Sequence, residues 1–275
     1  MAPVLKSVRL PTGVTLPYAE QGDPAGVPML FLHAIADSWH SFERVLAHLP
    51  DSIHAFVPTQ RGHGDATRPA TGYRPADFAA DMLAFLDAVA VEAAVFAGGS
   101  SGGFIGRRLA IDHPERTLGL VLLGSPATLQ GKPDLLELWH STLATLTDPI
   151  DPQLVRDFAQ SCLAQPVPAP FFETIVQENL KPPARVWTAT FKGLLEDNSF
   201  RELHHINAPT LVVWGDQDAI LPRSDQESMT AAIPNSRLLV YPGAGHAFYW
   251  ESPERVAGDL AAHVADLGSP RAQSD

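Results

Sequence analysis

The chain has 275 residues, 45% of them hydrophobic and 18% charged, which fits one sizeable globular domain, or a domain with an insertion. Acidic residues outnumber basic ones by 31 to 19, so the formal net charge is −12. No basic tract appears, and this argues against nucleic acid or an anionic membrane surface as a partner. The single cysteine, Cys162, excludes an intrachain disulfide and a cysteine-based metal site.

No segment of the sequence indicates secretion or a membrane span. The first residues lack the apolar stretch of a secretion signal, and the apolar runs fall short of the roughly 20 residues that a spanning helix needs. We therefore expect a cytoplasmic protein that does not associate with membranes and is a monomer or a small homo-oligomer.

Short apolar runs bounded by glycine and proline predict strands that are buried on both faces. Helical periodicity lies between them: in residues 75–90, Phe78, Met82 and Phe85 share one face and Asp81 lies off it. Strands alternating with helices indicate an α/β fold, a mostly parallel sheet flanked by helices. The predicted strands are Met29–Leu32, Ala93–Ala97, Leu120–Leu123, Leu211–Trp214 and Leu238–Tyr241.

One segment breaks the alternation. No convincing strand occurs from Thr128 to about Ile206, and stiff proline-rich joints at 165–170 and 181–185 separate its helical patches. We predict a core formed by residues 1–127 and 209–275, and a helical cap insertion at 128–208. The patches are Asp134–Leu146, Pro152–Leu163, Phe171–Leu180 and Ala184–Glu196, and the tail Gly268–Asp275 is predicted to fray.

A glycine-rich turn, FAGGSSGGF, occupies residues 96–104. It is not a phosphate-binding loop, because Phe104 stands where that motif needs lysine, nor a dinucleotide fingerprint, because Ser100 stands where that motif needs glycine. G-x-S-x-G remains, a strand–turn–helix that presents a serine hydroxyl. The pattern fits Ser100 or Ser101, and we favour Ser100 because the apolar strand then runs directly into the first glycine.

A serine nucleophile needs a base, and the base needs an orienting group. Two later stretches supply candidates just past predicted strands: WGDQD, with Asp216 and Asp218, and GAGH, with His246. The carboxyl ends of parallel strands lie at one edge of a sheet, where catalytic groups gather. The order Ser100, Asp218, His246 is the one expected with a nucleophile elbow.

With these stretches, the sequence resembles the α/β-hydrolase family over nearly its whole length. FLHAIADSWHSF looks like the family's oxyanion segment and QRGHGDATRP like its R-G-x-G loop, while GAGHAFYWESPERV carries an H-x4-E-x-P tail. The resemblance implies an eight-stranded, mostly parallel sheet, with a helical lid inserted after the sixth strand. The strand-poor segment 128–208 occupies that place.

The resemblance also assigns roles. Ser100 aligns with the nucleophile, His246 with the base and Asp218 with the acid, since the pattern W-G-x-x-D selects Asp218 over Asp216. The loop after the sixth strand, Gly124-Ser125-Pro126, offers no alternative carboxylate. The backbone N–H groups of Ile35 and Ser101 would form the oxyanion hole. The chain departs from the family pattern at Ala34, which replaces a glycine, and at Thr59 and Ala66.

The remaining polar candidates have simpler interpretations. His33 and His63 are expected to pack and form hydrogen bonds, the pair His204-His205 is expected on the surface or in a loop, and Asp37 is expected to be a helix N-cap. No HExxH motif or other metal-ligand spacing is present, so no metal or cofactor is expected. Aromatic side chains line the expected substrate pocket: Trp39, Phe104, Trp139, Trp187 and Phe248.

Together these features predict a serine hydrolase that cleaves a small-to-medium, mostly apolar carboxylic ester through an acyl-enzyme. Lactone hydrolysis, carbon–carbon bond hydrolysis and perhydrolysis use the same triad in this family and stay open. A hypothesis of another class is a slow-turnover small-molecule receptor. Relatives of this fold with an aspartate nucleophile are disfavoured, because a serine stands at position 100.

Overall fold

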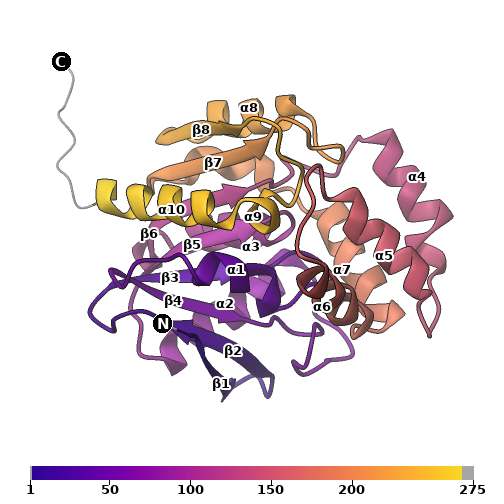
Figure 1. Cartoon of the computed structure of the whole chain (residues 1–275), viewed down its shortest axis with the longest axis horizontal. Helices are drawn as coiled ribbons and strands as arrows, with labels where there is room; N and C mark the ends of the chain where they lie inside the picture. Colours follow the sequence, from indigo (N-terminus) through magenta and orange to yellow (C-terminus); the bar gives the residue numbers. More distant parts are fainter. Residues whose placement is uncertain (1, 268–275) are drawn as a thin grey trace.

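The computed structural model describes residues 2–267, and the predicted fraying tail Gly268–Asp275 lies outside the described residues. It contains an eight-stranded sheet in the order β1-β2-β4-β3-β5-β6-β7-β8 (Figure 1). β1 and β2 pair antiparallel to their neighbours and the other strands are parallel, which confirms the predicted fold class. The strands are β1 (Val4–Arg9), β2 (Thr15–Gln21), β3 (Val27–Leu32), β4 (Ile53–Pro58), β5 (Ala94–Gly99), β6 (Thr117–Leu123), β7 (Thr210–Gly215) and β8 (Ser236–Tyr241).

Helices cover both faces of the sheet. In β3, Met29 and Phe31 belong to one apolar cluster, whereas Leu30 and Leu32 belong to the other, as the alternation of side chains along a strand requires. α1 (Glu43–Leu46), α9 (Phe248–Glu251) and α10 (Pro253–Leu267) pack with the first cluster. α2 (Pro75–Ala88), α3 (Gly102–Asp112) and α8 (Arg223–Ala232) pack with the second.

The apolar runs of the sequence did not predict three of the eight strands, β1, β2 and β4. β1 is mostly exposed and β2 alternates buried with half-buried residues, so neither forms a continuous apolar run. β4 is buried throughout, but His54 interrupts its run. Asp81 was expected to lie off the apolar face of α2 and is instead fully buried, because the Arg61 guanidinium binds both its carboxylate oxygens at 2.5 Å.

Between β6 and β7 the chain forms α4 (Pro133–Ser141), α5 (Pro152–Ser161), α6 (Ala169–Leu180) and α7 (Ala184–Glu196), in the four predicted helical patches. These helices gather at one end of the sheet (Figure 1). Most buried apolar side chains of α5, α6 and α7, among them Val155, Ile175 and Trp187, belong to the first apolar cluster, and Val186 belongs to the second. The segment therefore packs onto the core instead of standing apart from it.

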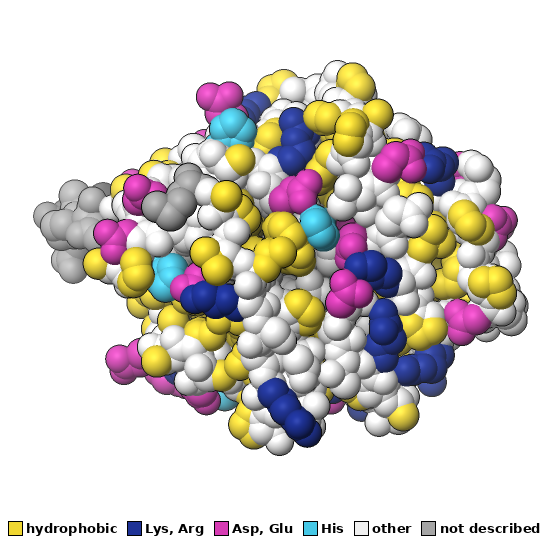
Figure 2. Space-filling model, turned by 60° about the horizontal axis from the view of Figure 1, so that its bottom comes forward, with side chains coloured by type: hydrophobic (Ala, Val, Ile, Leu, Met, Phe, Trp, Pro, Cys, Tyr) yellow, Lys and Arg dark blue, Asp and Glu magenta, His cyan; other side chains and the backbone are white. Residues whose placement is uncertain are grey.

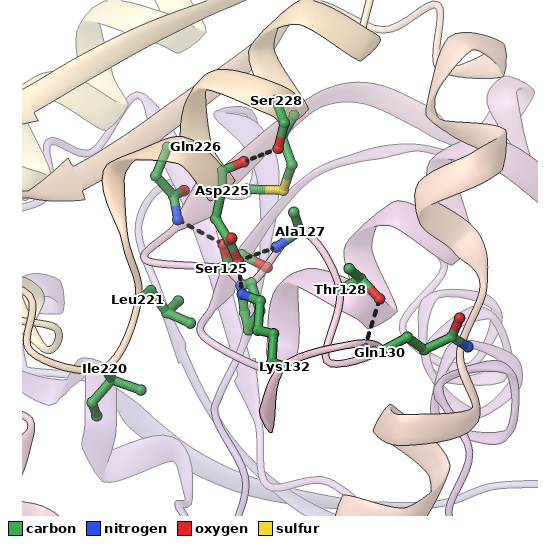
Figure 3. A network of polar contacts seen from close by, with 12 residues as sticks. Ser125, Ala127, Thr128, Gln130, Lys132, Ile220, Leu221, Asp225, Gln226 and Ser228 are labelled. Atoms are coloured by element: carbon green, nitrogen blue, oxygen red, sulfur yellow. Dashed lines mark hydrogen bonds and ion pairs between the residues drawn. The ribbon is translucent and has the colours of Figure 1, made fainter. Parts of the chain in front are cut away.

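Polar contacts tie the start of the inserted segment to α8 (Figure 3). The Asp225 carboxylate accepts the Ala127 N–H at 3.1 Å and pairs with Lys132, and Gln226 donates to the Ser125 carbonyl at 3.0 Å. From α3, the fully buried Arg107 donates to the carbonyls of residues 126 and 127, both at 2.9 Å. Asp197, near the far end of the segment, lies 3.9 Å from the same guanidinium.

The surface matches the mixed charge of the sequence. On the face in Figure 2, acidic and basic side chains are interspersed, and hydrophobic side chains lie among them in small groups. No helix within residues 2–267 combines the length and the apolar character needed to cross a bilayer.

Candidate active site

Ser100 occupies a sharp turn between β5 and α3. Its φ is +48°, a left-handed conformation that costs energy for a residue other than glycine. The turn is possible because its neighbours lack side chains: a Cβ on Gly98 would lie 2.5 Å from the backbone of Gly102, and one on Gly102 would lie 2.1 Å from the Leu32 oxygen. The turn therefore needs the glycines of the sequence motif and presents the half-buried Ser100 at the end of β5.

Ser100, His246 and Asp218 form a continuous chain of hydrogen bonds. His246 Nε2 lies 2.9 Å from Ser100 Oγ, and His246 Nδ1 lies 2.8 Å from Asp218 Oδ2. A carboxylate only accepts, so Nδ1 carries the proton and the Nε2 lone pair faces the serine hydroxyl. The arrangement can accept the hydroxyl proton and hold the imidazolium that results.

The loop after β7 fixes the position of Asp218. Its second carboxylate oxygen, Oδ1, accepts the N–H groups of Ile220 at 2.8 Å and Leu221 at 2.9 Å, and its side chain is fully buried. Asp216 is exposed and accepts the Gly243 N–H at 2.7 Å. The two carboxylates therefore differ in kind: Asp218 faces the histidine, and Asp216 ties the loop after β7 to the loop after β8.

The predicted oxyanion residues lie beside Ser100, but their contacts differ from a simple pair of free N–H groups. The Ile35 N–H donates to Ser101 Oγ at 2.7 Å. Ala34, which replaces a glycine, is not the left-handed residue of this loop; Ala36 is, with φ +68°. Ser101 is the N-cap residue of α3, so its N–H lies at the helix N-terminus, where backbone donors have no partner within the helix.

His33 and His63 lie beneath this loop as packing residues, as predicted. His33 Nδ1 donates to the Ala34 carbonyl at 2.8 Å, and His33 Nε2 accepts the Gln60 N–H at 2.9 Å. Burial lowers the pKa of His33 well below its usual value and lowers the pKa of His63 to about 4. Both rings are therefore neutral near pH 7, and His33 links the loop after β3 to the loop after β4.

Asp37 is not the helix N-cap that the sequence predicted. Ser38 caps the 3₁₀ helix Trp39–Phe42, and Asp37 is buried, accepting the Ser41 hydroxyl at 2.8 Å. Ser41 in turn accepts the Trp250 indole N–H at 2.9 Å. Burial raises the pKa of Asp37 to about 7, since the charged carboxylate loses its hydration.

Glu251 is a positioning residue to which sequence reasoning assigned no role. Its Oε2 accepts the Gly245 N–H at 2.9 Å, next to His246. Its Oε1 accepts the N–H groups of Ala164 at 2.6 Å and Gln165 at 2.9 Å, in the joint between α5 and α6. Glu251 thus holds the histidine loop against the inserted segment, and the H-x4-E spacing was the signal that could have identified it.

A cavity of about 320 Å³ lies among α4, α5 and α7 and reaches Ile35 and Ile220 beside the triad residues. Apart from Thr142, Asp157 and Ser161, every residue that lines it is hydrophobic. A site of this volume and lining is typical of a pocket for an apolar ligand.

The five expected pocket residues lie in different places. Trp187 lines the cavity, and Trp139 stacks on Phe191, which also lines it. Phe104 and Phe248 are instead fully buried in the core, where Phe104 packs under the Arg107 guanidinium at 4.1 Å. Trp39 lines a separate, more polar cavity of about 250 Å³.

The acidic side chains near Ser100 form their hydrogen bonds with other groups of the same chain. Asp218 pairs with His246, whereas both carboxylate oxygens of Glu251 accept backbone N–H groups. Within residues 2–267, no group of three or more His, Cys, Asp or Glu side chains is placed to hold a metal ion.

Comparison with known proteins agrees with the fold. Residues 27–253 match the model of the alpha/beta hydrolase fold family, and the chain belongs to this family. Lipase 1 of Psychrobacter immobilis is 26% identical, over 97% of this chain and 86% of the lipase. The 2-hydroxymuconate semialdehyde hydrolase of Pseudomonas sp. (strain CF600) is 29% identical, over 88% of each chain. The crystal structure of a hydrolase from Pseudomonas aeruginosa PA01 superposes with a TM-score of 0.84 at 25% identity, over 96% of this chain and 98% of that one.

Proposed function

We propose that this protein is a serine hydrolase that cleaves small-to-medium, mostly apolar carboxylic esters through an acyl-enzyme. The observation that supports this most strongly is the hydrogen-bond chain from Ser100 through His246 to Asp218. Membership of a hydrolase family and similarity to a lipase support the same reaction class.

In the proposed reaction, Ser100 Oγ attacks the ester carbonyl carbon while His246 Nε2 takes the hydroxyl proton. The carbonyl π electrons move to the oxygen, which becomes the oxyanion, and they return when the alcohol leaves with the proton from His246. Water then attacks the acyl-enzyme with His246 again as base, releasing the acid and restoring Ser100. Asp218 keeps the imidazole in the required tautomer and stabilises its protonated form.

The volume and the lining of the cavity fit an apolar acyl group. The cavity volume of about 320 Å³ lies at the lower end of the range for small-molecule pockets, which fits an acyl chain of small to medium length. Among the described residues that line it, none is Lys, Arg or His, and Asp157 is the charged one. A substrate with a free carboxylate in this cavity would therefore lack a cationic partner, which disfavours acidic substrates.

We also propose that residues 128–208 act as a cap, because α4, α5 and α7 supply most of the cavity wall. Lactones, carbon–carbon bonds and hydrogen peroxide as acyl acceptor are alternatives for the same triad. A receptor with slow turnover is the alternative of another class.

A fluorophosphonate probe tests the nucleophile. We expect a mass increase of one adduct, mapped to Ser100, and none in Ser100→Ala. A p-nitrophenyl ester series of increasing acyl length then measures the pocket, and we expect fast multiple turnover with the highest kcat/KM at medium length. An adduct on Ser101 would contradict the assigned register. A single slow turnover on every ester and lactone would favour the receptor.

A further inference from the structure

Two consecutive serines occupy the turn, and the proposed mechanism uses the hydroxyl of only one. Ser100 Oγ faces His246, whereas Ser101 Oγ accepts the Ile35 N–H at 2.7 Å. The second hydroxyl is therefore hydrogen-bonded to one of the two backbone N–H groups, those of Ile35 and Ser101, that the family resemblance assigned to the oxyanion. Ser101 is 8% exposed, so this contact is shielded from bulk water.

The hydrogen-bond capacity of Ser101 is only partly used. A hydroxyl has one proton to donate and two lone pairs to accept with. One lone pair receives the Ile35 N–H, and among residues 2–267 the Ser101 hydroxyl donates to no protein acceptor. Its side chain does not cap α3 either. The proton is thus free to point at an acceptor that enters the site.

The contact with Ile35 also changes what Ser101 can do. It directs the Ile35 N–H to Ser101 Oγ, so this group is engaged before substrate arrives. A hydroxyl that accepts a hydrogen bond is polarised and becomes a stronger donor, particularly where water is excluded. A substrate oxygen beside this pair would thus meet the Ser101 hydroxyl and not a free Ile35 N–H.

We propose that the Ser101 hydroxyl is a donor of the oxyanion hole, standing in for the Ile35 N–H and acting together with the Ser101 N–H. The inference rests on the proposed function. When Ser100 attacks, negative charge develops on the former carbonyl oxygen, and the Ser101 hydroxyl donates a hydrogen bond to it without transferring its proton. The helix dipole at the first turn of α3 favours the same charge.

Kinetics of three variants test this role. Removing one oxyanion donor typically lowers kcat by about 10²- to 10³-fold, so we expect Ser101→Ala to fall in that range with a much smaller change in KM. Ser101→Thr keeps a hydroxyl and should recover most of the rate. Ser199→Ala, which removes another buried hydroxyl before β7, should leave kcat within about threefold, because Ser199 lies outside the turn.

Binding of a transition-state mimic separates an oxyanion donor from a merely structural residue. An aryl trifluoromethyl ketone forms a hemiketal with Ser100 whose oxygen is the oxyanion. We expect its Ki to rise in Ser101→Ala by about the factor by which kcat/KM falls, while the Ki of the product acid stays constant.

Each outcome has a separate meaning. If Ser101→Ala keeps kcat/KM and ketone affinity within threefold of the wild type, or improves them, the Ile35 N–H serves the oxyanion directly and the inference is wrong. Equal losses in Ser101→Ala and Ser101→Thr, with ketone affinity unchanged, would also overturn it, because the loss would then be structural. If the wild type neither hydrolyses esters nor reacts with a fluorophosphonate, the proposed function fails and the inference fails with it.

Discussion

His246 Nε2 lies within 2.9 Å of Ser100 Oγ although 146 residues separate them in the chain. The sheet produces this proximity, because β5 and β8 are parallel and the loops that follow them leave from the same edge. Asp218 follows β7, which lies next to β8. Three short loops on adjacent parts of one rigid sheet thus determine the geometry on which the proposed chemistry depends.

Asp218→Asn should lower kcat by about 10⁴-fold, by analogy with the corresponding change in serine proteases. An amide can present its NH₂ group to His246 Nδ1, and the Nε2 lone pair then no longer faces Ser100. Steady-state kinetics on the best p-nitrophenyl ester measure the loss. Asp216→Asn is the matched control, since Asp216 is exposed and contacts Gly243 instead of the histidine. Equal losses in the two variants would contradict the assignment of the acid.

Val155→Phe should shift the preferred acyl chain to shorter lengths. Val155 is buried in the wall of the 320 Å³ cavity, so a larger side chain there occupies space proposed for the substrate. The ratio of kcat/KM values for butyrate and octanoate esters reports the change, and Val155→Ala should move it the other way. If neither variant alters the dependence of kcat/KM on acyl length, the acyl chain does not bind in this cavity.

Glu251→Gln should destabilise the fold by about 1 to 3 kcal/mol, because the new NH₂ group faces backbone donors instead of accepting from them. It should also lower kcat, since the Gly245 N–H that Glu251 binds adjoins His246. Thermal unfolding and kinetics are measured on the same samples. Glu254→Gln, an exposed neighbour, is the control. Unchanged stability and rate in Glu251→Gln would show that the histidine loop holds its place without this carboxylate.

The buried carboxyl of Asp37 should make stability fall as pH rises. Burial raises its pKa from 3.8 to about 7, so in this window the folded state binds a proton that the unfolded state has released. The contribution is complete below pH 3.8 and is lost as pH rises through 7. Glu178 adds to the upward shift, and the Ser41 hydroxyl opposes it.

His63 affects stability in the opposite direction, because folding lowers its pKa from 6.5 to about 4. Its contribution to the free energy of unfolding therefore grows as pH rises from 4 to 6.5. The two effects overlap in the wild type, and a difference measurement separates them. We expect urea denaturation to show that the free energy of unfolding at pH 8 minus that at pH 5 is more positive in Asp37→Asn than in the wild type. An identical pH dependence in both proteins would mean that Asp37 does not titrate in this range.

The order of the motifs was sufficient to predict the fold class. It also predicted that Ser100, Asp218 and His246 lie close together, because each of them follows a strand that an apolar run in the sequence identifies. The hydrogen bond from Ile35 to Ser101 could not be predicted in the same way. It depends on the direction of one backbone N–H, which tertiary packing determines and no local sequence pattern encodes.

Burial explains the other differences. An aromatic side chain near a motif can pack inward, as Phe104 and Phe248 do, or face the cavity, as Trp187 does, and composition does not distinguish the two. Asp37 and Asp81 also appeared ordinary in the sequence. Their roles depend on partners that other segments supply, Ser41 for Asp37 and Arg61 for Asp81.

Arg107 gives the inserted helices a common anchor. One guanidinium binds the carbonyls of residues 126 and 127, where the insertion leaves the sheet, and lies near Asp197, close to where the chain returns. The excursion therefore starts and finishes at neighbouring points on α3, the helix that begins beside Ser100. A replacement segment would have to keep these two end points and also replace the core contacts of Val155, Ile175 and Trp187, so the junction determines where the inserted helices start and finish but not their course between.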